Sequence, residues 1–349
     1  QVTEHIELAA GARWTDEERK HRFRNGLANW EEVNLLTPRI NADNLSPEFS
    51  ITYTPTDSLT LFAAYRQGFK SGSFNTVVSA NESTRADFGD EKAEGGEIGL
   101  KARFFDNSLA VNLAAYHYRY SDLQVGANDL AESGAILLNT INAASAKVEG
   151  IELETVYTPA AVPGLTLHGA VNYNHARYNR FSNAPCGNGQ TIAEGCDQLL
   201  DLATGRYTSQ DLSGRPLVRA PDWTASFGFD YERPIGNDMT LAFGSTTGYS
   251  SEYYTNLVAQ RDFQQDSYFK TSANIALRGP EDKWEVALIG NNLANRITAG
   301  TCANANIQNG VIFGGQLTGG ETKGPAGDDE VFCVPERGRE LLIRLTWRL

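Results

Sequence analysis

The stretch Leu165-Thr166-Leu167-His168-Gly169-Ala170-Val171-Asn172-Tyr173-Asn174 decides the fold, because its residues alternate in character. The odd positions hold Leu, Leu, Gly, Val and Tyr, and the even positions hold Thr, His, Ala, Asn and Asn. Successive side chains of a β-strand point to opposite faces, so this pattern predicts a strand with one apolar and one polar face. Helical spacing, with about 3.6 residues per turn, does not explain it.

The same alternation recurs along the whole chain of 349 residues. Trp223–Tyr231, Ile98–Phe104 and Leu341–Leu349 are clear examples. Around Tyr116–Tyr118 the alternation is broken, which a β-bulge would explain. The pattern predicts about twelve strands, near 4–15, 44–53, 58–69, 93–104, 108–121, 146–157, 165–177, 219–232, 238–250, 267–278, 283–294 and 338–349.

The connections between these strands alternate between short and long. Tight turns rich in Pro, Gly, Asp and Asn occur near 55–57, 105–107, 159–164, 234–237 and 279–282. Long polar loops occur near 70–92, 122–145, 178–218, 251–266 and 295–337. In an up-and-down meander every second connection lies on the same side, so the short turns share one rim and the long loops share the other. This layout is typical of outer-membrane barrels and predicts an all-β, antiparallel up-and-down transmembrane β-barrel.

The two strand faces differ as such a barrel requires. On the apolar face, aromatic residues stand near both strand ends: Tyr53, Phe104, Tyr157, Tyr231 and Trp284 beside the short turns, and Tyr65, Tyr173 and Tyr249 at the other ends. Aromatic residues at both interfaces form the girdles of a membrane barrel, although strand propensity alone also favours Tyr and Trp. The other face carries residues that lipid would not tolerate, so we expect them in the lumen: Arg66, Glu97, Lys101, Arg103, Glu152, Glu154, Asn172, Asn291, Arg344 and Arg348.

Composition excludes several classes of protein. The 43 acidic residues outnumber the 30 basic ones, and a net charge of −13 argues against a nucleic-acid-binding surface. No apolar run approaches the roughly 20 residues of a transmembrane helix. The sequence starts without a Met or a signal peptide, so we expect a mature product or a piece of a longer chain.

The four cysteines lie in polar, Gly-rich stretches: Cys186 and Cys196 in one, and Cys302 and Cys333 flanking another. An even number of loop cysteines favours disulfides in an oxidising compartment, with the connectivity left open. Unpaired thiols or a metal site are the alternatives, but no CxxC or Cys/His spacing supports a metal.

Several strings resemble the barrel strands of TonB-dependent outer-membrane receptors. Leu59–Gly72 (LTLFAAYRQGFKSG) is similar to the "lYasyskGFksG" strand of that family, and Glu91–Lys101 to its "E…E-x-G-x-K" strand. Val148–Glu154 is similar to the "v-x-G-x-E-x-E" strand, and Trp284–Leu293, ending in Asn-Asn-Leu, to the penultimate strand. The motifs follow the family's order along essentially the whole chain.

The resemblance implies a barrel of about 22 strands with an N-terminal plug domain and a TonB box. Residues 1–349 would be the C-terminal portion of that barrel, without the plug. The implied location is the outer membrane of a Gram-negative bacterium, with membrane lipid and TonB as partners, the latter contacted through the N-terminal part.

The implied function is active import of a scarce ligand, such as a ferric siderophore, a cobalamin or a glycan, by TonB coupling. Because function on barrels concentrates in long loops, loop residues are the candidates for ligand binding. They are Phe74, Arg85, Phe88, Tyr253, Tyr254, Arg261 and Phe313, and the alternative for each is a residue that packs on its neighbours.

A passive outer-membrane porin is the alternative function, because charged lumen residues suit it equally well. An enzyme is not predicted, since the five histidines form no HExxH motif and neither a GxSxG motif nor a P-loop occurs. Asp87, Asp90 and Glu91 lack the spacing of an EF-hand, so we expect no metal site and no cofactor.

Overall fold

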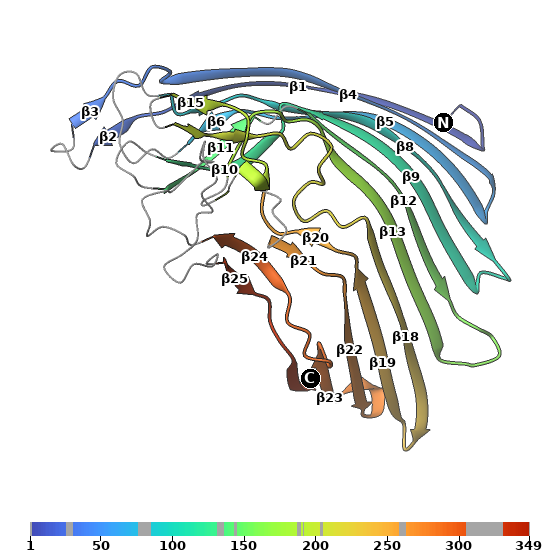
Figure 1. Ribbon diagram of the computed structural model, residues 1–349. Helices are drawn as coiled ribbons and strands as arrows, with labels where there is room; N and C mark the ends of the chain where they lie inside the picture. Colours follow the sequence, from blue (N-terminus) through green and yellow to red (C-terminus); the bar gives the residue numbers. More distant parts are fainter. Residues whose placement is uncertain are drawn as a thin grey trace.

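The computed structural model describes residues 2–25, 31–75, 85–130, 136–142, 145–186, 190, 192–202, 205–257, 263–304 and 331–348. Twelve long strands form one antiparallel sheet in which the strands follow each other in chain order (Figure 1). They are β1 (Ile6–Lys20), β4 (Arg39–Thr56), β5 (Leu59–Lys70), β8 (Glu91–Phe104), β9 (Leu109–Ser121), β12 (Ser145–Tyr157), β13 (Leu165–Arg180), β18 (Trp223–Gly236), β19 (Met239–Ser250), β22 (Tyr268–Arg278), β23 (Trp284–Asn291) and β26 (Glu340–Trp347). The sheet curves into an open wall, with the two chain ends well apart.

The predicted strands and meander are confirmed. Each of the twelve predicted segments overlaps one long strand, and the short turns lie along the right and lower edges of Figure 1 while the minor hairpins lie at the opposite strand ends. A sixth long connection, residues 21–38 between β1 and β4, was not predicted. It carries the short strands β2 (Phe23–Asn25) and β3 (Glu31–Val33).

The other long connections also form small hairpins of their own. Their strands are β6 (Ser73–Phe74) with β7 (Asp87–Phe88), β10 (Gln124–Leu130) with β11 (Ile136–Asn142), β14 (Ala184–Pro185) with β17 (Ser209–Gln210), β15 (Leu200–Asp201) with β16 (Arg206–Tyr207), β20 (Tyr253–Tyr254) with β21 (Gln264–Gln265), and β24 (Ala299–Asn304) with β25 (Val331–Pro335). Two 3-10 turns, Ile192–Glu194 and Pro280–Asp282, complete the described elements. No helix in the described residues is long and apolar enough to cross a membrane.

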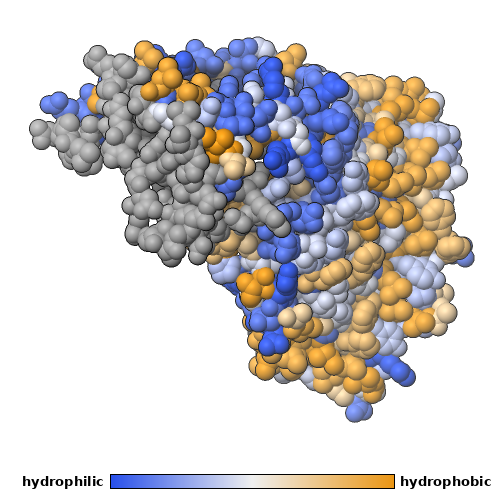
Figure 2. Space-filling view, in the orientation of Figure 1, coloured by the Kyte–Doolittle hydropathy of each residue, from blue (hydrophilic) through white to orange (hydrophobic). Residues whose placement is uncertain are grey.

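One face of the sheet, here called the outer face, is apolar and open. The register of β12, β13 and β18 aligns Leu153, Val171 and Ala225, and the pattern continues from strand to strand. Large apolar side chains on this face remain exposed, Ile98 by 64% and Phe227 by 58%. Figure 2 shows apolar residues gathered over the sheet away from the minor hairpins. A face of this kind is what a barrel turns toward lipid.

The predicted aromatic positions lie on the outer face. Neighbouring strands bring rings together there, with centroids 4.8 Å apart for Tyr173 and Trp223 and 5.2 Å apart for Tyr231 and Phe243. Cross-strand aromatic pairs of this sort stabilise a sheet by roughly 0.2–1 kcal/mol each.

The bulge expected around Tyr116–Tyr118 is absent, so that prediction was wrong. β9 pairs with β8 and with β12 in continuous register through these residues. The alternation changes there because a polar residue, His117, lies on the outer face, where its Nδ1 is 3.0 Å from Oε2 of Glu149 on β12.

The longest described connection, between β13 and β18, packs on the other face, here called the inner face. Phe181 and Leu212 are buried with Ala146 and Tyr178, which belong to the inner face near the strand ends. Disulfides join Cys186 to Cys196 and Cys302 to Cys333, each within one long connection. The connection between β13 and β18 therefore shares a small core with the inner face of the sheet, and each disulfide crosslinks one long connection within itself.

Candidate functional site

The inner face carries the charged wall of the protein. All the predicted lumen residues that belong to strands lie on this face. The strand register shows this, because side chains paired across neighbouring strands point to the same side of the sheet. Five of them, Arg66, Glu97, Lys101, Glu152 and Glu154, line a single cavity of about 520 Å³, here called the wall cavity. The wall cavity thus joins charged residues of three strands, β5, β8 and β12, which the sequence alternation had assigned to one face.

Ion pairs and hydrogen bonds organise the wall cavity. Arg66 Nη1 lies 2.7 Å from Glu97 Oε1, and Lys101 Nζ lies 6.0 Å from the centre of the Phe62 ring. Glu154 accepts a long hydrogen bond of 3.5 Å from Asn112. With three carboxylates and two cations among these residues, the cavity has a slight excess of acid.

The remaining predicted lumen residues lie elsewhere on the same wall. Asn172 accepts a hydrogen bond of 3.4 Å from the Tyr116 hydroxyl. Arg344 Nη2 is 2.8 Å from Glu285 Oε1, and Glu285 also pairs with Arg278 at 3.1 Å. Arg348 donates to the carbonyl of Asp282 beside a short turn. Arg103 and Asn291 share the face, and Arg103 has no ion pair with a described residue.

A second cavity, of about 440 Å³, lies on the inner face near the long connections and is here called the rim cavity. It is lined by Arg219, Pro221, Thr224, Gly248, Tyr249, Ser250, Tyr253, Tyr268, Lys270, Gly300 and Glu336. Strands β18, β19 and β22 supply its floor, and the β20 and β24–β25 hairpins supply its sides.

Two cations and the phenols of Tyr253 and Tyr268 set the chemistry of the rim cavity, since the ring of the third tyrosine, Tyr249, packs on Phe269 on the outer face. Lys270 Nζ lies 2.7 Å from Glu336 Oε2 and 5.1 Å from the centre of the Tyr268 ring. Arg219 donates to the Gly300 carbonyl and to the Thr301 hydroxyl. Among the charged lining residues, two cations face one carboxylate, so the rim cavity favours an anion.

The pKa values of Tyr253 and Glu336, two titratable groups of the rim cavity, are shifted from their ordinary values. Burial, with help from the neighbouring Tyr268, raises the pKa of Tyr253 to about 12, so its hydroxyl stays protonated and able to donate. Hydrogen bonds from Lys270 and Thr298 lower the pKa of Glu336, which keeps that carboxylate charged.

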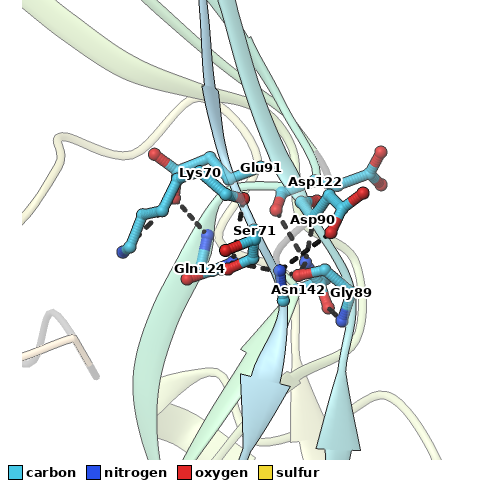
Figure 3. A network of polar contacts seen from close by, with 9 residues as sticks. Lys70, Ser71, Gly89, Asp90, Glu91, Asp122, Gln124 and Asn142 are labelled. Atoms are coloured by element: carbon cyan, nitrogen blue, oxygen red, sulfur yellow. Dashed lines mark hydrogen bonds and ion pairs between the residues drawn. The ribbon is translucent and has the colours of Figure 1, made fainter. Parts of the chain in front are cut away.

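A polar network holds two of the long connections together near the ends of β5 and β8 (Figure 3). The Gln124 side-chain amide donates to the carbonyls of Ser71 and Gly89, at 3.2 and 3.0 Å. The Asn142 amide donates to the carbonyls of Gly89 and Asp122, at 3.0 and 2.8 Å, and its oxygen accepts from the Gly89 N–H. Side-chain amides here take the place of backbone pairing, so the segments around Ser71, Gly89, Asp122 and Asn142 are held together.

Of the predicted ligand-binding residues that the structure describes, only Tyr253 lines the rim cavity. Phe74 stacks on His21 with ring centroids 4.9 Å apart, and Arg85 pairs with Asp87 at 2.9 Å. Phe88 is half-buried on β7, and Tyr254 contributes its carbonyl to the Arg219 N–H. Arg261 and Phe313 lie outside the described residues.

Sequence reasoning missed Arg219, Tyr268 and Lys270. Tyr268 and Lys270 continue the even-numbered polar face of their strand, which is the signal that could have found them. Arg219 lies between strands with a positive φ of 55°, and no pattern in the sequence places it.

His168 on the inner face lies between a hydroxyl and a carboxylate, as a catalytic histidine does, but the distances do not form a catalytic triad. His168 Nε2 lies 3.2 Å from the Thr246 hydroxyl, but Nδ1 is 3.6 Å from Asp230 Oδ2. That separation is too long for the hydrogen bond that orients a catalytic base. In the described part of the chain no group of three or more His, Cys, Asp or Glu residues is arranged to hold a metal.

The fold and its two faces define the class: a barrel wall with a lipid-type outside and a charged inside. Residues 1–293 match the family model described as "TonB dependent receptor-like, beta-barrel". The chain therefore belongs to the TonB-dependent receptor family, which is a family of transport receptors. A comparison with curated proteins found no match.

Solved structures share the fold at low identity. The ferric yersiniabactin uptake receptor FyuA from Yersinia pestis has a TM-score of 0.68 and 16% identity, and the match covers 99% of this chain and 43% of that one. The siderophore receptor PiuA from Acinetobacter baumannii has a TM-score of 0.65 and 16% identity, and the match covers 99% of this chain and 41% of that one. For the copper transporter OprC the TM-score is 0.61 and the identity 16%, with 99% of this chain and 45% of that one covered. This chain thus spans less than half the length of each of these receptors.

Proposed function

We propose that this chain is the C-terminal portion of an outer-membrane receptor of a Gram-negative bacterium that imports a metal chelate of the ferric-siderophore class. Transport would be driven by TonB, and the remaining barrel strands and plug would come from further sequence. The observation that carries the proposal is the sheet with an apolar outer face and an ion-paired inner face, in a chain that belongs to the TonB-dependent receptor family. Lipid against the outer face is part of the proposal.

The rim cavity supports the substrate class. Arg219 and Lys270 supply positive charge, while Tyr253 and Tyr268 supply flat surface and hydroxyl donors. An anionic, partly aromatic chelate satisfies both, since guanidinium and ammonium groups bind oxyanions and aromatic rings stack. The names of the similar structures, with ferric yersiniabactin and copper among them, favour a metal as cargo. Cobalamin and glycans remain the competing cargo classes.

The test is growth and uptake in a deletion strain. Cells lacking the gene would be supplied with single iron sources, with cobalamin or with glycans, and complemented with the complete gene. We expect growth to depend on the gene for a ferric chelate only, and to require TonB and the proton gradient. Uptake that persists without TonB would contradict active transport.

Variants of the rim cavity locate the binding step. We expect Tyr268→Ala and Lys270→Ala to reduce uptake of the radiolabelled ferric chelate about tenfold or more, since an ionic hydrogen bond contributes roughly 1.5–3 kcal/mol. Arg85→Ala is the matched control, because Arg85 pairs with Asp87 in another hairpin. Equal uptake by all three variants would exclude the rim cavity as the binding site.

A further inference from the structure

The charges that line the rim cavity do not balance. Among the lining residues that the structure describes, Arg219 and Lys270 are the cations and Glu336 is the one carboxylate. Lys270 and Glu336 form an ion pair with 2.7 Å between Nζ and Oε2. Arg219 donates its hydrogen bonds to neutral groups, the Gly300 carbonyl and the Thr301 hydroxyl, and has no ion pair with a described residue. The cavity therefore keeps one uncompensated positive charge.

The Glu336 carboxylate is fixed in its place. The hydroxyl of the buried Thr298 donates to Oε2 at 2.6 Å, and the Glu336 N–H donates to the Thr298 carbonyl at 2.9 Å. Thr298 directly precedes β24 and Glu336 directly follows β25, and the disulfide between Cys302 and Cys333 joins these two strands. The carboxylate can leave the cavity only by breaking contacts of both its side chain and its backbone.

Glu336 also stays charged at neutral pH and acts on whatever enters the cavity. Hydrogen bonds from Lys270 and Thr298, helped by the charge of Arg219, hold the pKa of Glu336 below its ordinary value. Its side chain is 45% exposed, so the carboxylate faces the open part of the cavity that it lines. The repulsion between this fixed charge and a ligand grows in proportion to the negative charge of the ligand.

We propose that Glu336 determines the charge of the chelate that the rim cavity accepts, with one net negative charge preferred and several disfavoured. A singly negative chelate balances the charge left by Arg219. Each further negative charge meets the fixed carboxylate without a cation to compensate it. This inference rests on the proposed binding of a ferric chelate in the rim cavity, and it adds the charge that the chelate should carry.

A series of synthetic ferric chelates of similar size and aromatic content tests the proposal. A chelate with three aryl-hydroxamate arms is uncharged, exchange of one arm for a catecholate makes it singly negative, and three catecholate arms make it triply negative. Binding of each to the complete receptor, purified from outer membranes in detergent, is measured by isothermal titration calorimetry at neutral pH. We expect the wild type to bind the singly negative chelate most tightly.

Two variants separate the charge of Glu336 from its packing. Glu336→Gln removes the charge and keeps an oxygen that can accept from Lys270 and Thr298. We expect it to tighten binding of the triply negative chelate about tenfold and to change the affinity for the uncharged chelate less than about twofold. Glu336→Asp keeps the charge and should keep the wild-type order of the three chelates. Added salt should narrow the difference between the wild type and Glu336→Gln, because salt screens exposed charges.

Glu281→Gln is the matched control. Glu281 pairs with Lys283 at the same distance of 2.7 Å, but it lies in a short turn at the opposite ends of the strands, so its order of affinities should be that of the wild type. Heat-modifiable migration on gels checks that each variant is folded, and Glu336→Ala is measured if Glu336→Gln fails to fold.

The outcomes separate this inference from the transport function. If Glu336→Gln changes the affinity for all three chelates by the same factor, or leaves all three unchanged, the charge preference is overturned while the rim cavity remains a chelate site. Tightest binding of the triply negative chelate by the wild type would overturn it as well. Binding of none of the three chelates to the wild type would count against the ferric-chelate function itself and would overturn this inference with it.

Discussion

At the scale of single residues, alternation was enough to sort side chains between two faces. Neighbours such as Val171 and Asn172 have opposite environments because a strand turns each successive side chain over. The same rule placed Arg66 and Glu154 on one wall although 88 positions separate them in the sequence. It could not place Arg219, which lies outside a strand, where the path of the chain depends on contacts with distant loops.

Adjacent positions on β13 offer a direct test of the two faces. Val171→Arg puts a charge on the outer face, where it costs roughly 2–4 kcal/mol at the bilayer midplane. Asn172→Arg puts the same charge on the polar wall, so we expect little change in folding free energy. Equilibrium folding into lipid vesicles, followed by tryptophan fluorescence, measures the difference. Equal destabilisation by the two variants would contradict the assignment of faces.

The Glu336 carboxylate gives a pH-dependent anchor for the β24–β25 hairpin. Lys270 and Thr298 lower its pKa below the ordinary value of 4.5, so the pairing stabilises the hairpin above about pH 4.5. The stabilisation is lost as the pH falls through the lowered pKa. Hydrogen exchange at the Glu336 N–H, which bonds the Thr298 carbonyl, should therefore accelerate in acid after correction for the intrinsic rate. Glu336→Gln should remove this step, and a step that survives in the variant would assign it to another group.

At the scale of elements, the strands, the short turns and five of the long connections were predictable, while the hairpins inside the long connections were not. Strand length and turn residues are local properties, and all twelve strands follow from them. The hairpins within the long connections depend on the amides of Gln124 and Asn142 and on the pairing of Cys302 with Cys333, all made between separated segments. The expected bulge in β9 failed for a related reason, since His117 is polar yet faces outward beside Glu149.

Close packing of β9, β12 and β13 around Gly150 gives a prediction for this part of the sheet. A Cβ at Gly150 would collide with the Tyr173 carbonyl and lie 2.5 Å from the Tyr116 hydroxyl. We expect Gly150→Val to destabilise the sheet by about 1–3 kcal/mol through overpacking. Gly68→Ala is the control, because its nearest atoms are 4.0 Å away. The measurement is the temperature at which each variant stops migrating as a compact, folded species on a gel. Equal temperatures for the two variants would count against this close packing.

At the scale of the whole molecule, the sheet has two free edges. In the part of the chain that the structure describes, β1 pairs only with β4, and β26 pairs only with β23. A barrel in lipid satisfies every backbone group by closing, and an open edge in hydrocarbon is costly. The chain matches 43% and 41% of the lengths of two similar receptors.

The free edges lead to a prediction for these 349 residues produced alone in detergent. About half of the amides in β1 and β26 should exchange rapidly, whereas those of β12, which bonds neighbours on both sides, should be protected. Hydrogen exchange with mass spectrometry measures this, and the same chain should also self-associate through its edges. Equal protection of all three strands would mean that β1 and β26 seal against each other.

The disulfides have a consequence for biogenesis. Cys186–Cys196 and Cys302–Cys333 both lie on the side of the long connections, opposite the short turns. In the proposed outer-membrane orientation that side faces the outside of the cell, and both disulfides would then cross the bilayer during assembly. Oxidation of the thiols in the periplasm would precede this passage, so the insertion machinery would have to pass two closed loops of chain rather than a linear segment.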